Sequence, residues 1–344
     1  MTQWPLSIRS QWLVAAHAGK VGKRPLAVTV LDVPLVLARA ADGKVLVFED
    51  RCPHRQVPLS CGRMTERGLQ CPYHGWTFGG DGKVVAMPGL GPDTPMPAVS
   101  ARAIRCQEHN GLVWVRLAEA GEEEGDAPDT PPASMIRGLP GSTSQPWQAY
   151  WKTGIVDAIE NFLDPLHTHT LHPGLVRRDG TRRPVQASVR LTEEGFRVDY
   201  RGQTEQSGLL YRLFESPRVS ECAVFSGVGS ARIEYRYQNG SAIDVTLHFT
   251  PAHGGETHVF ASMAVAGRWA PRWALYLFVL PFLSKVGRQD QYMVELQAAN
   301  KARFGDSDAG VSTSLDLVRP YVAALWQGKP FAREAFERDV VLYL

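Results

Sequence analysis

Two short segments of the chain each pair a cysteine with a histidine at nearly the same spacing. The first is Cys52-Pro-His54, and after sixteen intervening residues the second reads Cys71-Pro-Tyr-His74. Two thiolates and two imidazoles can bind one [2Fe–2S] cluster, with the cysteines on one iron and the histidines on the other. Exchanging two anionic sulfurs for two neutral nitrogens lowers the negative charge of the cluster and raises its potential. The pattern therefore predicts an electron-transfer centre.

A zinc ion is the main alternative occupant of two cysteines and two histidines. Zinc-finger spacing groups Cys with Cys and His with His, whereas each of these segments mixes the two types. The order of the ligands and the flanking Pro and Gly residues favour the iron–sulfur cluster.

A second group of potential metal ligands lies between residues 157 and 172. His167, His169 and His172 place three of the ten histidines of the chain within six positions. Two imidazoles and one carboxylate with open positions are typical of an oxygen-activating non-haem Fe(II) site. On a regular helix, residues three apart are neighbours and residues five apart are not, which favours His169 with His172. The segment after Asp164-Pro165 need not be a regular helix, so the residues alone leave the pair open; a surface histidine cluster is the alternative.

Both groups resemble those of the Rieske non-haem iron oxygenases, in particular the terminal oxygenase component, or alpha subunit, of ring-hydroxylating and demethylating systems. Respiratory Rieske proteins carry an extra cysteine in each ligand loop. Here Tyr73 stands between Pro72 and His74, and Cys61 in the intervening loop has no partner there. The sequence therefore resembles the oxygenase and ferredoxin branch.

The resemblance implies which residues act at the iron. The family shows Asn, then Asp, then His, four residues, and His, which maps onto Asn161, Asp164, His167 and His172. It implies His167 and His172 as iron ligands, and His169 as a supporting or packing residue. Asp164 resembles the family's bridging carboxylate, which accepts hydrogen bonds from its own His167 and from His74 of the partner subunit.

The carboxylate ligand is expected in a late helix, in a segment of the family that reads acid or amide, Asp, several residues, and Glu. Residues 289–295, Gln-Asp-Gln-Tyr-Met-Val-Glu, match this pattern. The resemblance implies Asp290 as the third iron ligand, with Glu295 as the fallback.

Composition agrees with a soluble two-domain enzyme. The 344 residues are enough for two sizeable cores, and 37 Lys and Arg against 35 Asp and Glu leave no basic surface for nucleic acid. Beyond the cluster ligands, three scattered cysteines remain, which argues for a reducing compartment. We find no signal peptide and no apolar run of the ~20 residues that span a bilayer, so we expect a cytoplasmic protein. The most apolar run, residues 275–283, is expected to be a buried wall of the core.

The chain predicts an α+β protein. Strand patterns at 26–31, 44–50 and 112–117 predict a small all-β domain over residues 1–118, with the cluster loops at its tip. An acidic, Pro- and Gly-rich stretch predicts a linker over 119–148. Alternating patterns at 185–191, 196–200, 231–237 and 243–249 predict an antiparallel sheet in a catalytic domain over 149–344, flanked by helices at 152–166, 286–303 and 314–327. The resemblance implies a helix-grip-like arrangement.

The resemblance also implies cofactors and partners. These are the [2Fe–2S] cluster, a mononuclear Fe(II), and NAD(P)H used indirectly through a separate reductase, with or without a ferredoxin. Dioxygen and an aromatic or other apolar small molecule are the expected substrates. The expected reaction is hydroxylation, by mono- or dioxygenation, or oxidative demethylation, and the expected assembly is a head-to-tail homotrimer. We see no dinucleotide or flavin motif in the chain. A Rieske-type electron carrier and a redox sensor are the alternatives.

Two further sets of residues bear on the substrate. Six aromatic residues are candidates for an apolar pocket or for core packing: Tyr211, Phe214, Trp269, Trp273, Tyr276 and Phe278. Four arginines are candidates for binding a carboxylate or for a solvated loop: Arg177, Arg178, Arg182 and Arg183.

Overall fold

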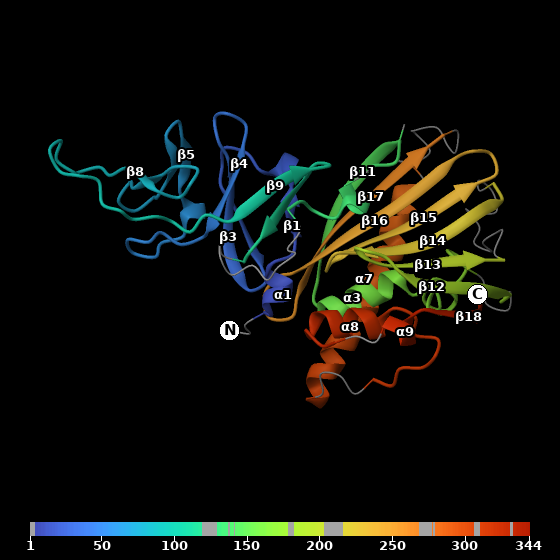
Figure 1. Ribbon diagram of the computed structural model, residues 1–344. Coiled ribbons are helices and arrows are strands. Elements are labelled where there is room, and N and C mark those ends of the chain that lie inside the picture. The colour runs from blue at the N-terminus through green and yellow to red at the C-terminus, as the bar shows by residue number, and fades with distance from the viewer. Residues whose placement is uncertain are drawn as a thin grey trace. The chain divides into compact units, whose positions relative to one another are not determined.

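The computed structural model describes two compact units. The described residues are 4–118, 129–136, 138–140, 142–177, 182–202, 216–267, 277, 279–305, 310–330 and 333–344. One unit comprises Met1–Pro131 with Thr250–Gly254, and the other comprises Pro132–Phe249 with Gly255–Leu344. Figure 1 shows the helices and strands of both units.

The first unit is built from three small antiparallel sheets, with strand orders β1-β10-β9, β2-β3-β4 and β5-β6-β7-β8. Its described elements are α1 (Leu6–Arg9), β1 (Leu13–His17), β2 (Leu26–Val30), β3 (Val33–Arg39), β4 (Val45–Glu49), β5 (Arg63–Thr65), β6 (Gly68–Gln70), β7 (Thr77–Phe78), β8 (Val84–Ala86), β9 (Arg105–His109) and β10 (Leu112–Arg116), with 3-10 helices at Ala18–Lys20 and Leu59–Cys61. The predicted strands at 26–31, 44–50 and 112–117 correspond to β2, β4 and β10.

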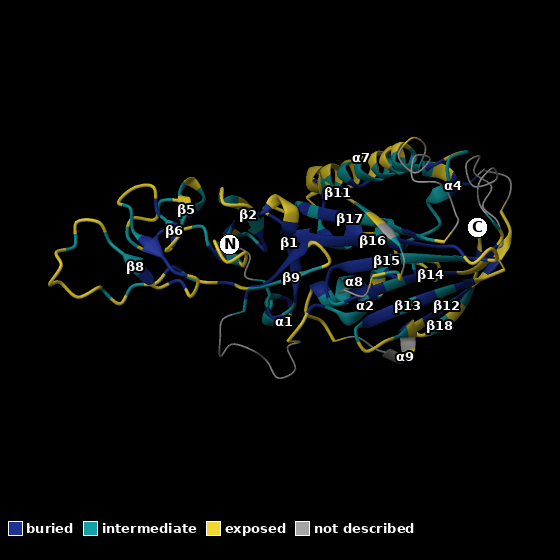
Figure 2. Ribbon diagram, turned by 90° about the horizontal axis from the view of Figure 1, so that it is seen from above, coloured by how far each residue is buried: buried dark blue, intermediate teal, exposed yellow. Residues whose placement is uncertain are grey.

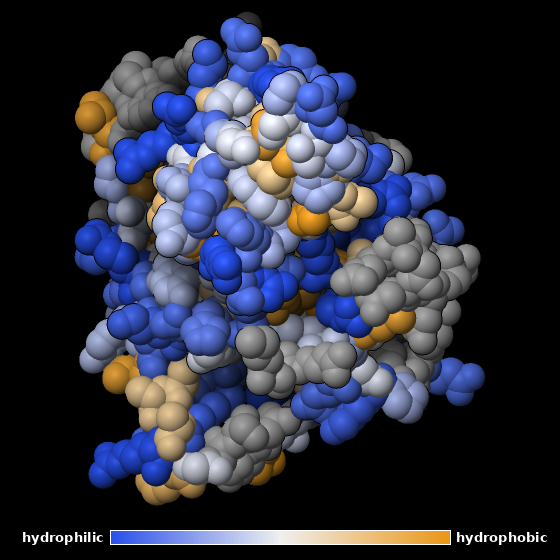
Figure 3. Space-filling model, turned by 90° about the vertical axis from the view of Figure 1, so that its left-hand side faces the viewer, coloured by the Kyte–Doolittle hydropathy of each residue, from blue (hydrophilic) through white to orange (hydrophobic). Residues whose placement is uncertain are grey.

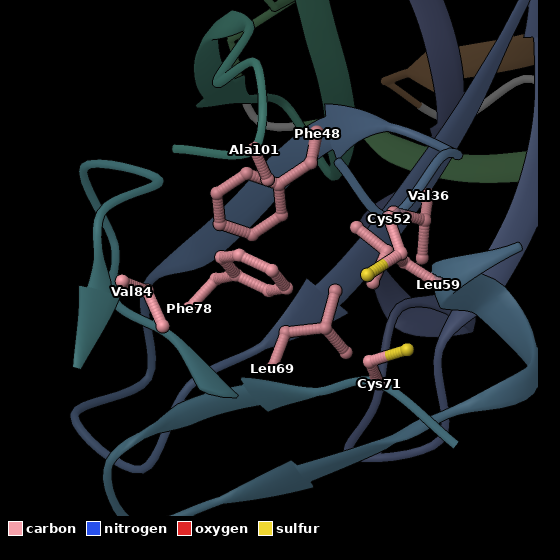
Figure 4. Packing of buried hydrophobic residues seen from close by; sticks show 9 residues of the cluster. All are labelled: Val36, Phe48, Cys52, Leu59, Leu69, Cys71, Phe78, Val84 and Ala101. Atoms are coloured by element: carbon pink, nitrogen blue, oxygen red, sulfur yellow. The ribbon is translucent and has the colours of Figure 1, made fainter. Parts of the chain in front are cut away.

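The sheet β5-β6-β7-β8 forms one side of a small hydrophobic cluster that continues to the two predicted cluster cysteines. Figure 4 shows the cluster, whose members are Val36, Phe48, Cys52, Leu59, Leu69, Cys71, Phe78, Val84 and Ala101. Burial of such apolar groups contributes roughly 25 cal/mol per Å² to stability. The core of this unit therefore also fixes the positions of the two thiols.

The second unit contains an eight-stranded antiparallel sheet in the order β11-β17-β16-β15-β14-β13-β12-β18. Its described elements are α2 (Ala133–Ile136), β11 (Thr143–Trp151), α3 (Ile155–Leu163), α4 (Thr168–Leu171), β12 (Pro184–Leu191), β13 (Gly195–Arg201), β14 (Arg218–Ser226), β15 (Ser230–Tyr237), β16 (Ala242–Pro251), β17 (Thr257–Ala266), α7 (Leu280–Phe304), α8 (Arg319–Trp326), α9 (Arg333–Phe336) and β18 (Arg338–Tyr343). The predicted α+β class and antiparallel sheet are confirmed.

Two helices of this unit carry the residues expected at the iron. Helix α3 ends at Leu163, three residues before the predicted end, because Asp164 has an extended backbone (ψ 118°) ahead of Pro165. Helix α7 is longer than predicted: Pro281 lies in its first turn, and Gly305 (φ 67°) ends it in the left-handed conformation. Figure 2 shows α7 along one side of the sheet, with exposed residues on its outer face.

Ion pairs connect α3 to the helices beside it. Lys301 of α7 donates to both carboxylate oxygens of Asp157 at 2.8 and 2.9 Å. Arg319 of α8 donates to Asp157 at 2.9 Å and to Glu160 at 2.5 Å. Because Asp157 is 8% exposed, these bonds supply the partners that a buried carboxylate needs. Helix α3 is thereby fixed against α7 and α8.

The apolar run at 275–283 differs in part from the expected buried wall. Residues 275, 276 and 278 lie outside the described residues, and Leu277 is 64% exposed. Leu283, in the first turns of α7, packs against the buried residues Ile243, Met263 and Val265. Val279 packs against the same cluster, so the second half of the run contributes to the core.

Among the described residues, we find no helix that is both long and apolar enough to cross a bilayer. The face in Figure 3 is mostly hydrophilic, with small separate hydrophobic areas.

The predicted linker contains secondary structure where the structure describes it. Helix α2 and the first residues of β11 lie between 119 and 148, of which residues 119–128, 137 and 141 are not described. The domain boundaries at 118 and 149 therefore stay predictions.

Candidate metal centres

The two cysteine–histidine loops have the same backbone hydrogen-bond pattern. The amide of Cys52 donates to Val57 O at 2.9 Å, and the amide of Cys71 donates to Trp76 O at 2.8 Å. Four residues after each cysteine, the amides of Gln56 and Gly75 donate back to the cysteine carbonyl at 2.8 and 3.2 Å. Each cysteine is thus held at the base of a tight turn that closes on itself.

The fourth position after each cysteine requires left-handed backbone. Gln56 has φ 62° and Gly75 has φ 71°. At Gly75 a Cβ atom would also lie 2.9 Å from Pro88 Cγ, so glycine meets both demands of the second loop.

The four predicted cluster ligands divide into a buried pair and a surface pair. Cys52 and Cys71 are each 2% exposed, and their sulfur atoms lie close together in Figure 4. Burial and the neighbouring Cys71 raise the pKa of the Cys52 thiol, although backbone amides oppose this. A cation between the sulfurs would remove the cost of ionising them, which agrees with the thiolate ligation of an iron–sulfur cluster.

The imidazoles are more exposed than the thiols, since His54 is half-buried and His74 is exposed. The rings of His54 and His74 are 4.6 Å apart between centroids, and Trp76 stacks on His54 at 4.4 Å with an interplanar angle of 2°. Burial, His74 and Arg55 lower the pKa of His54, which favours the neutral imidazole that a metal needs. Among the described residues, the buried Nδ1 of His54 has no hydrogen-bond partner. Two neighbouring imidazoles beside two buried thiols fit a [2Fe–2S] cluster with mixed ligands.

Three of the predicted iron-site residues meet in the second unit. The Nε2 atom of His172 lies 2.9 Å from Oδ1 of Asp290, and Nε2 of His167 lies 3.4 Å from the same oxygen. The ligand atoms of the three residues all lie within 4.8 Å of one another. Donor atoms at right angles around an ion with bonds of about 2.1 Å are about 3 Å apart, so this spacing fits one metal ion.

A very short helix brings the two histidines together. Helix α4 contains only Thr168–Leu171, with His167 as its N-cap and His172 as its C-cap. His172 has φ −117° and ψ 51°, which is not helical. The spacing rule for a regular helix therefore does not apply, and two residues five positions apart converge on Asp290.

We call His167, His172 and Asp290 the triad. In the metal-free protein, the pKa values of His167 and Asp290 are shifted from their usual values. Burial would lower the pKa of His167, but its interactions with Asp164 and Asp290 outweigh burial and raise the pKa to about 9. Burial would likewise raise the pKa of Asp290, but His167 and His172 hold it below its usual value. The carboxylate is thus ready to bind a cation, and a metal must displace a proton from His167.

Asp164 lies next to His167 but makes its hydrogen bond elsewhere. Its Oδ1 accepts from the amide of Leu166 at 2.9 Å, while Oδ2 is 3.7 Å from His167 Nδ1. That distance exceeds a hydrogen bond. The Nδ1 atom of His167 has no hydrogen-bond partner among the described residues, and neither has Oδ1 of Asn161 on α3. Asp164 therefore has a local structural role and one oxygen directed toward His167.

The other candidates fall outside the triad. His169 is buried, 1% exposed, and is not one of the three residues that could hold an ion. Glu295 accepts hydrogen bonds from the amide of Lys152 at 3.0 Å and from Gln291 at 2.8 Å. Among the described residues, neither belongs to the group of His167, His172 and Asp290.

Sequence reasoning missed Gln289 and misjudged Arg177. The Gln289 Oε1 atom lies 3.0 Å from His172 Nδ1, and the only signal was its position before Asp290. Arg177 is 2% exposed, not part of a solvated loop, and donates to Pro165 O and Thr168 Oγ1, both at 3.0 Å. Its guanidinium thus links Pro165 and Thr168, within the segment that carries both histidines. Arg182 and Arg183 are exposed, as expected of a solvated loop, whereas Arg178 and the six aromatic candidates lie outside the described residues.

Comparison with known proteins agrees with this geometry. Residues 11–111 match the Rieske [2Fe-2S] domain family, and residues 151–323 match the vanillate O-demethylase oxygenase C-terminal domain family. The chain belongs to the Rieske non-haem iron oxygenase family. The predicted family is therefore confirmed, and with it the two cofactors that characterise such oxygenases, a [2Fe–2S] cluster and a mononuclear iron.

Curated relatives of this family member include demethylases and a putative monooxygenase subunit. The chain is 30% identical over 172 residues to the putative toluene-4-sulfonate monooxygenase iron-sulfur subunit TsaM2 of Comamonas testosteroni, which covers 50% of the chain and 48% of the relative. It is 40% identical over 108 residues to dicamba O-demethylase of Stenotrophomonas maltophilia, covering 31% and 32%. It is 34% identical over 165 residues to methylxanthine N1-demethylase NdmA of Pseudomonas putida, covering 47% and 44%. The matches thus span about half of these relatives or less.

Solved structures share the fold along almost the whole chain. Dicamba monooxygenase bound to dicamba superimposes with a TM-score of 0.74 at 20% identity, over 93% of this chain and 98% of that one. The QL mutant of NdmA from Pseudomonas putida CBB5, with caffeine, superimposes with a TM-score of 0.76 at 24% identity, over 98% of this chain and 97% of that one. The chain therefore shares the fold of these structures, with an all-β domain followed by a domain built on an antiparallel sheet.

Proposed function

We propose that this chain is the terminal oxygenase component of a multicomponent Rieske oxygenase. It would insert one atom of dioxygen into a C–H bond of an aromatic or other apolar small molecule, with oxidative demethylation of a methoxy or N-methyl group as the favoured reaction. The observation that carries the proposal is the group of His167, His172 and Asp290, whose ligand atoms lie within 4.8 Å of one another. An electron carrier has no use for such a group.

Each metal centre has its own ligands in this proposal. Cys52, His54, Cys71 and His74 hold the cluster, and His167, His172 and Asp290 hold the iron, as the donor types and spacings support. When bound, the cluster would supply electrons, and the iron would supply the oxygen-activating chemistry of a 2-His-1-carboxylate site. The reaction R–O–CH₃ + O₂ + 2 e⁻ + 2 H⁺ gives R–OH, formaldehyde and water.

The side chains of this protein orient and insulate the chemistry. The carboxylate of Asp290 faces Nε2 of both histidines, so these three residues would hold the iron and would leave open positions for substrates, as in other 2-His-1-carboxylate sites. Arg177 holds the carbonyl of Pro165 and the hydroxyl of Thr168, which keeps His167 on the turn between them. Asp164 and Asn161 lie in the same segment and are proposed to act beside the iron, Asp164 as the carboxylate through which electrons pass.

The partners follow from the two-centre arrangement. We propose that a separate reductase takes electrons from NAD(P)H and passes them to the cluster, directly or through a ferredoxin. We propose a head-to-tail homotrimer in which Asp164 also accepts a hydrogen bond from His74 of the partner subunit. A cytoplasmic location is proposed with them, because such a system depends on NAD(P)H.

Iron content and oxygen uptake test the proposal together. The purified chain should contain three irons, two in the cluster and one at His167, His172 and Asp290. With a surrogate reductase and NADH, oxygen uptake should depend on an apolar methoxylated or N-methylated compound. Two irons per chain would indicate an electron carrier, and three irons without substrate-dependent oxygen uptake would indicate a redox sensor.

A further inference from the structure

The side-chain amide of Gln289 makes a contact with His172 that the proposed function does not use. Its Oε1 lies 3.0 Å from Nδ1 of His172, and the other ring nitrogen, Nε2, lies 2.9 Å from Asp290 Oδ1. The His172 side chain is 1% exposed. We propose that Gln289 is a positioning residue of the iron site, whose carbonyl oxygen fixes the tautomer and the ring orientation of His172. The inference rests on the proposed iron site.

The two ring nitrogens of His172 have different roles at the proposed iron site. A metal on Nε2 requires the lone pair there, so the proton of the neutral ring must be on Nδ1. A buried N–H needs an acceptor, and in the described part of the chain Gln289 Oε1 is within hydrogen-bond distance. The amide therefore favours the tautomer that can bind a metal and opposes rotation of the ring.

Helix α7 delivers this acceptor and the carboxylate ligand from consecutive positions. Successive residues of a helix point about 100° apart, so Gln289 and Asp290 can contact opposite nitrogens of one imidazole. A small shift of α7 would move both contacts together. Helix α7 thus positions Asp290, the proposed ligand of the iron, together with Gln289, the residue that orients His172.

The two proposed iron-ligand histidines, His167 and His172, differ in the charge of the group that faces Nδ1. Nδ1 of His167 faces the carboxylate of Asp164 at 3.7 Å, whereas Nδ1 of His172 faces a neutral amide at 3.0 Å. A carboxylate makes the imidazole a more basic ligand, and an amide orients it without adding charge. Gln289 therefore acts on geometry, and Asp164 also acts on charge.

The test uses the full chain with its cluster and with Co(II) in the mononuclear site. Gln289→Met removes the acceptor at nearly constant size, and Gln289→Glu keeps an acceptor. Gln291→Met is the matched control, because the amide of Gln291 on the same helix donates to Tyr150 O at 3.1 Å and to Glu295 at 2.8 Å. Two quantities are measured: the Kd for Co(II) by competition with a chelator, and the hyperfine-shifted exchangeable N–H signals of the ligand imidazoles by ¹H NMR.

We expect Gln289→Met to raise the Kd roughly 10–100-fold, as loss of an outer partner of a ligand does. One of the two N–H signals should disappear through exchange with water. Gln289→Glu should keep both signals, shift one of them, and bind Co(II) nearly as tightly as the unmodified chain. Gln291→Met should change neither quantity.

Three results would overturn the inference: an unchanged Kd and both signals in Gln289→Met, an equal loss in Gln291→Met, or an unshifted spectrum in Gln289→Glu. If Gln289→Met does not fold, the spectrum of Gln289→Glu decides alone. An unmodified chain that binds no Co(II), or binds it without imidazole signals, would instead show that the proposed iron site is wrong.

Discussion

All four candidate cluster ligands lie between residues 52 and 74, whereas Asp290 follows His172 by 118 positions. The cluster loops hold their cysteines through backbone hydrogen bonds within each loop. The iron site depends on one long helix meeting one irregular turn, with side-chain contacts from Arg177 and Gln289 around it. A site of the first kind is robust to distant changes, and a site of the second kind is sensitive to anything that moves α7 or the turn.

Removal of an iron ligand should give the largest effect and should leave the cluster intact. We expect His167→Ala and Asp290→Ala each to lose about one iron per chain, with all substrate-dependent activity, because two donors hold the ion poorly. The visible spectrum of the cluster should stay, since its ligands lie in another unit. Iron analysis and absorbance on the same samples measure both.

His169→Ala is the control for this pair, since His169 lies in the same turn outside the triad. It should keep all three irons. Loss of iron from His169→Ala but not from His167→Ala would show that the wrong imidazoles are assigned to the metal.

Asp164→Asn tests the link between the two centres. Asparagine keeps the oxygen that accepts from the Leu166 amide, but it removes the charge facing His167 Nδ1. Both metal sites should stay largely occupied. Reoxidation of the reduced cluster with substrate and oxygen should slow by at least roughly 10–100-fold, the cost of losing an outer partner, because the electron path is weakened as well. Rapid-mixing absorbance follows the cluster band.

An Asp164→Asn protein that turns over at the normal rate would show that electrons travel another way. Asp164 would then be only the acceptor that shapes the backbone before Pro165.

The pH dependence of metal uptake should distinguish the two centres further. In the metal-free chain the pKa of His167 is raised to about 9, so the ring is protonated at pH 7 and metal binding must release that proton. The apparent affinity for Co(II) should rise about tenfold per pH unit and level off near pH 9. By the same linkage, the raised pKa stabilises the metal-free fold below pH 6.5, and this stability is lost as the pH rises through 9.

Chelator competition between pH 6 and 10 measures this dependence. Asp164→Asn should move the plateau to lower pH, since Asp164 contributes to the raised pKa. A flat profile between pH 6 and 8 would contradict the assignment of His167 as a ligand.

Gly75→Ala should give the smallest effect and should be local to the cluster. Alanine at φ 71° costs roughly 1–2 kcal/mol, and its Cβ would lie 2.9 Å from Pro88 Cγ. Gly111→Ala is the matched control, because Gly111 has φ 73° and nothing within 4 Å of the added Cβ. In urea titrations Gly75→Ala should lose at least as much stability as Gly111→Ala, and only Gly75→Ala should shift the cluster spectrum. Equal spectra would mean that the loop adapts without moving His74.

The contrast between the two centres also decides what the sequence alone could predict. The cluster ligands could be identified because two loops of the same design repeat within one short segment. Asp290 could be identified only through family resemblance, since a carboxylate on a helix 118 positions away carries no local signal. The spacing rule favoured His169 with His172 because it assumes a regular helix, whereas α4 is four residues long and His172 is not helical.

Elements of the fold were predictable where one physical pattern dominated. The strands β12, β13, β15 and β16 alternate clearly and were found. Strand β14 was missed, because polar residues such as Glu221 occupy its buried face and pair there with Arg218. Gln289 and the buried Arg177 were beyond prediction for the same reason: their roles come from tertiary contacts with His172 and with Pro165 and Thr168.

Product analysis under ¹⁸O₂ tests most directly that electrons from the cluster are used for oxygen insertion. The full chain is supplied with a surrogate reductase, NADH and a panel of methoxylated, N-methylated and unsubstituted aromatic compounds. For a demethylated substrate, one ¹⁸O atom should appear in trapped formaldehyde, the phenol should keep its original oxygen, and Asp290→Ala should give no product. Products without ¹⁸O, or equal yields from Asp290→Ala, would contradict the oxygenase proposed here.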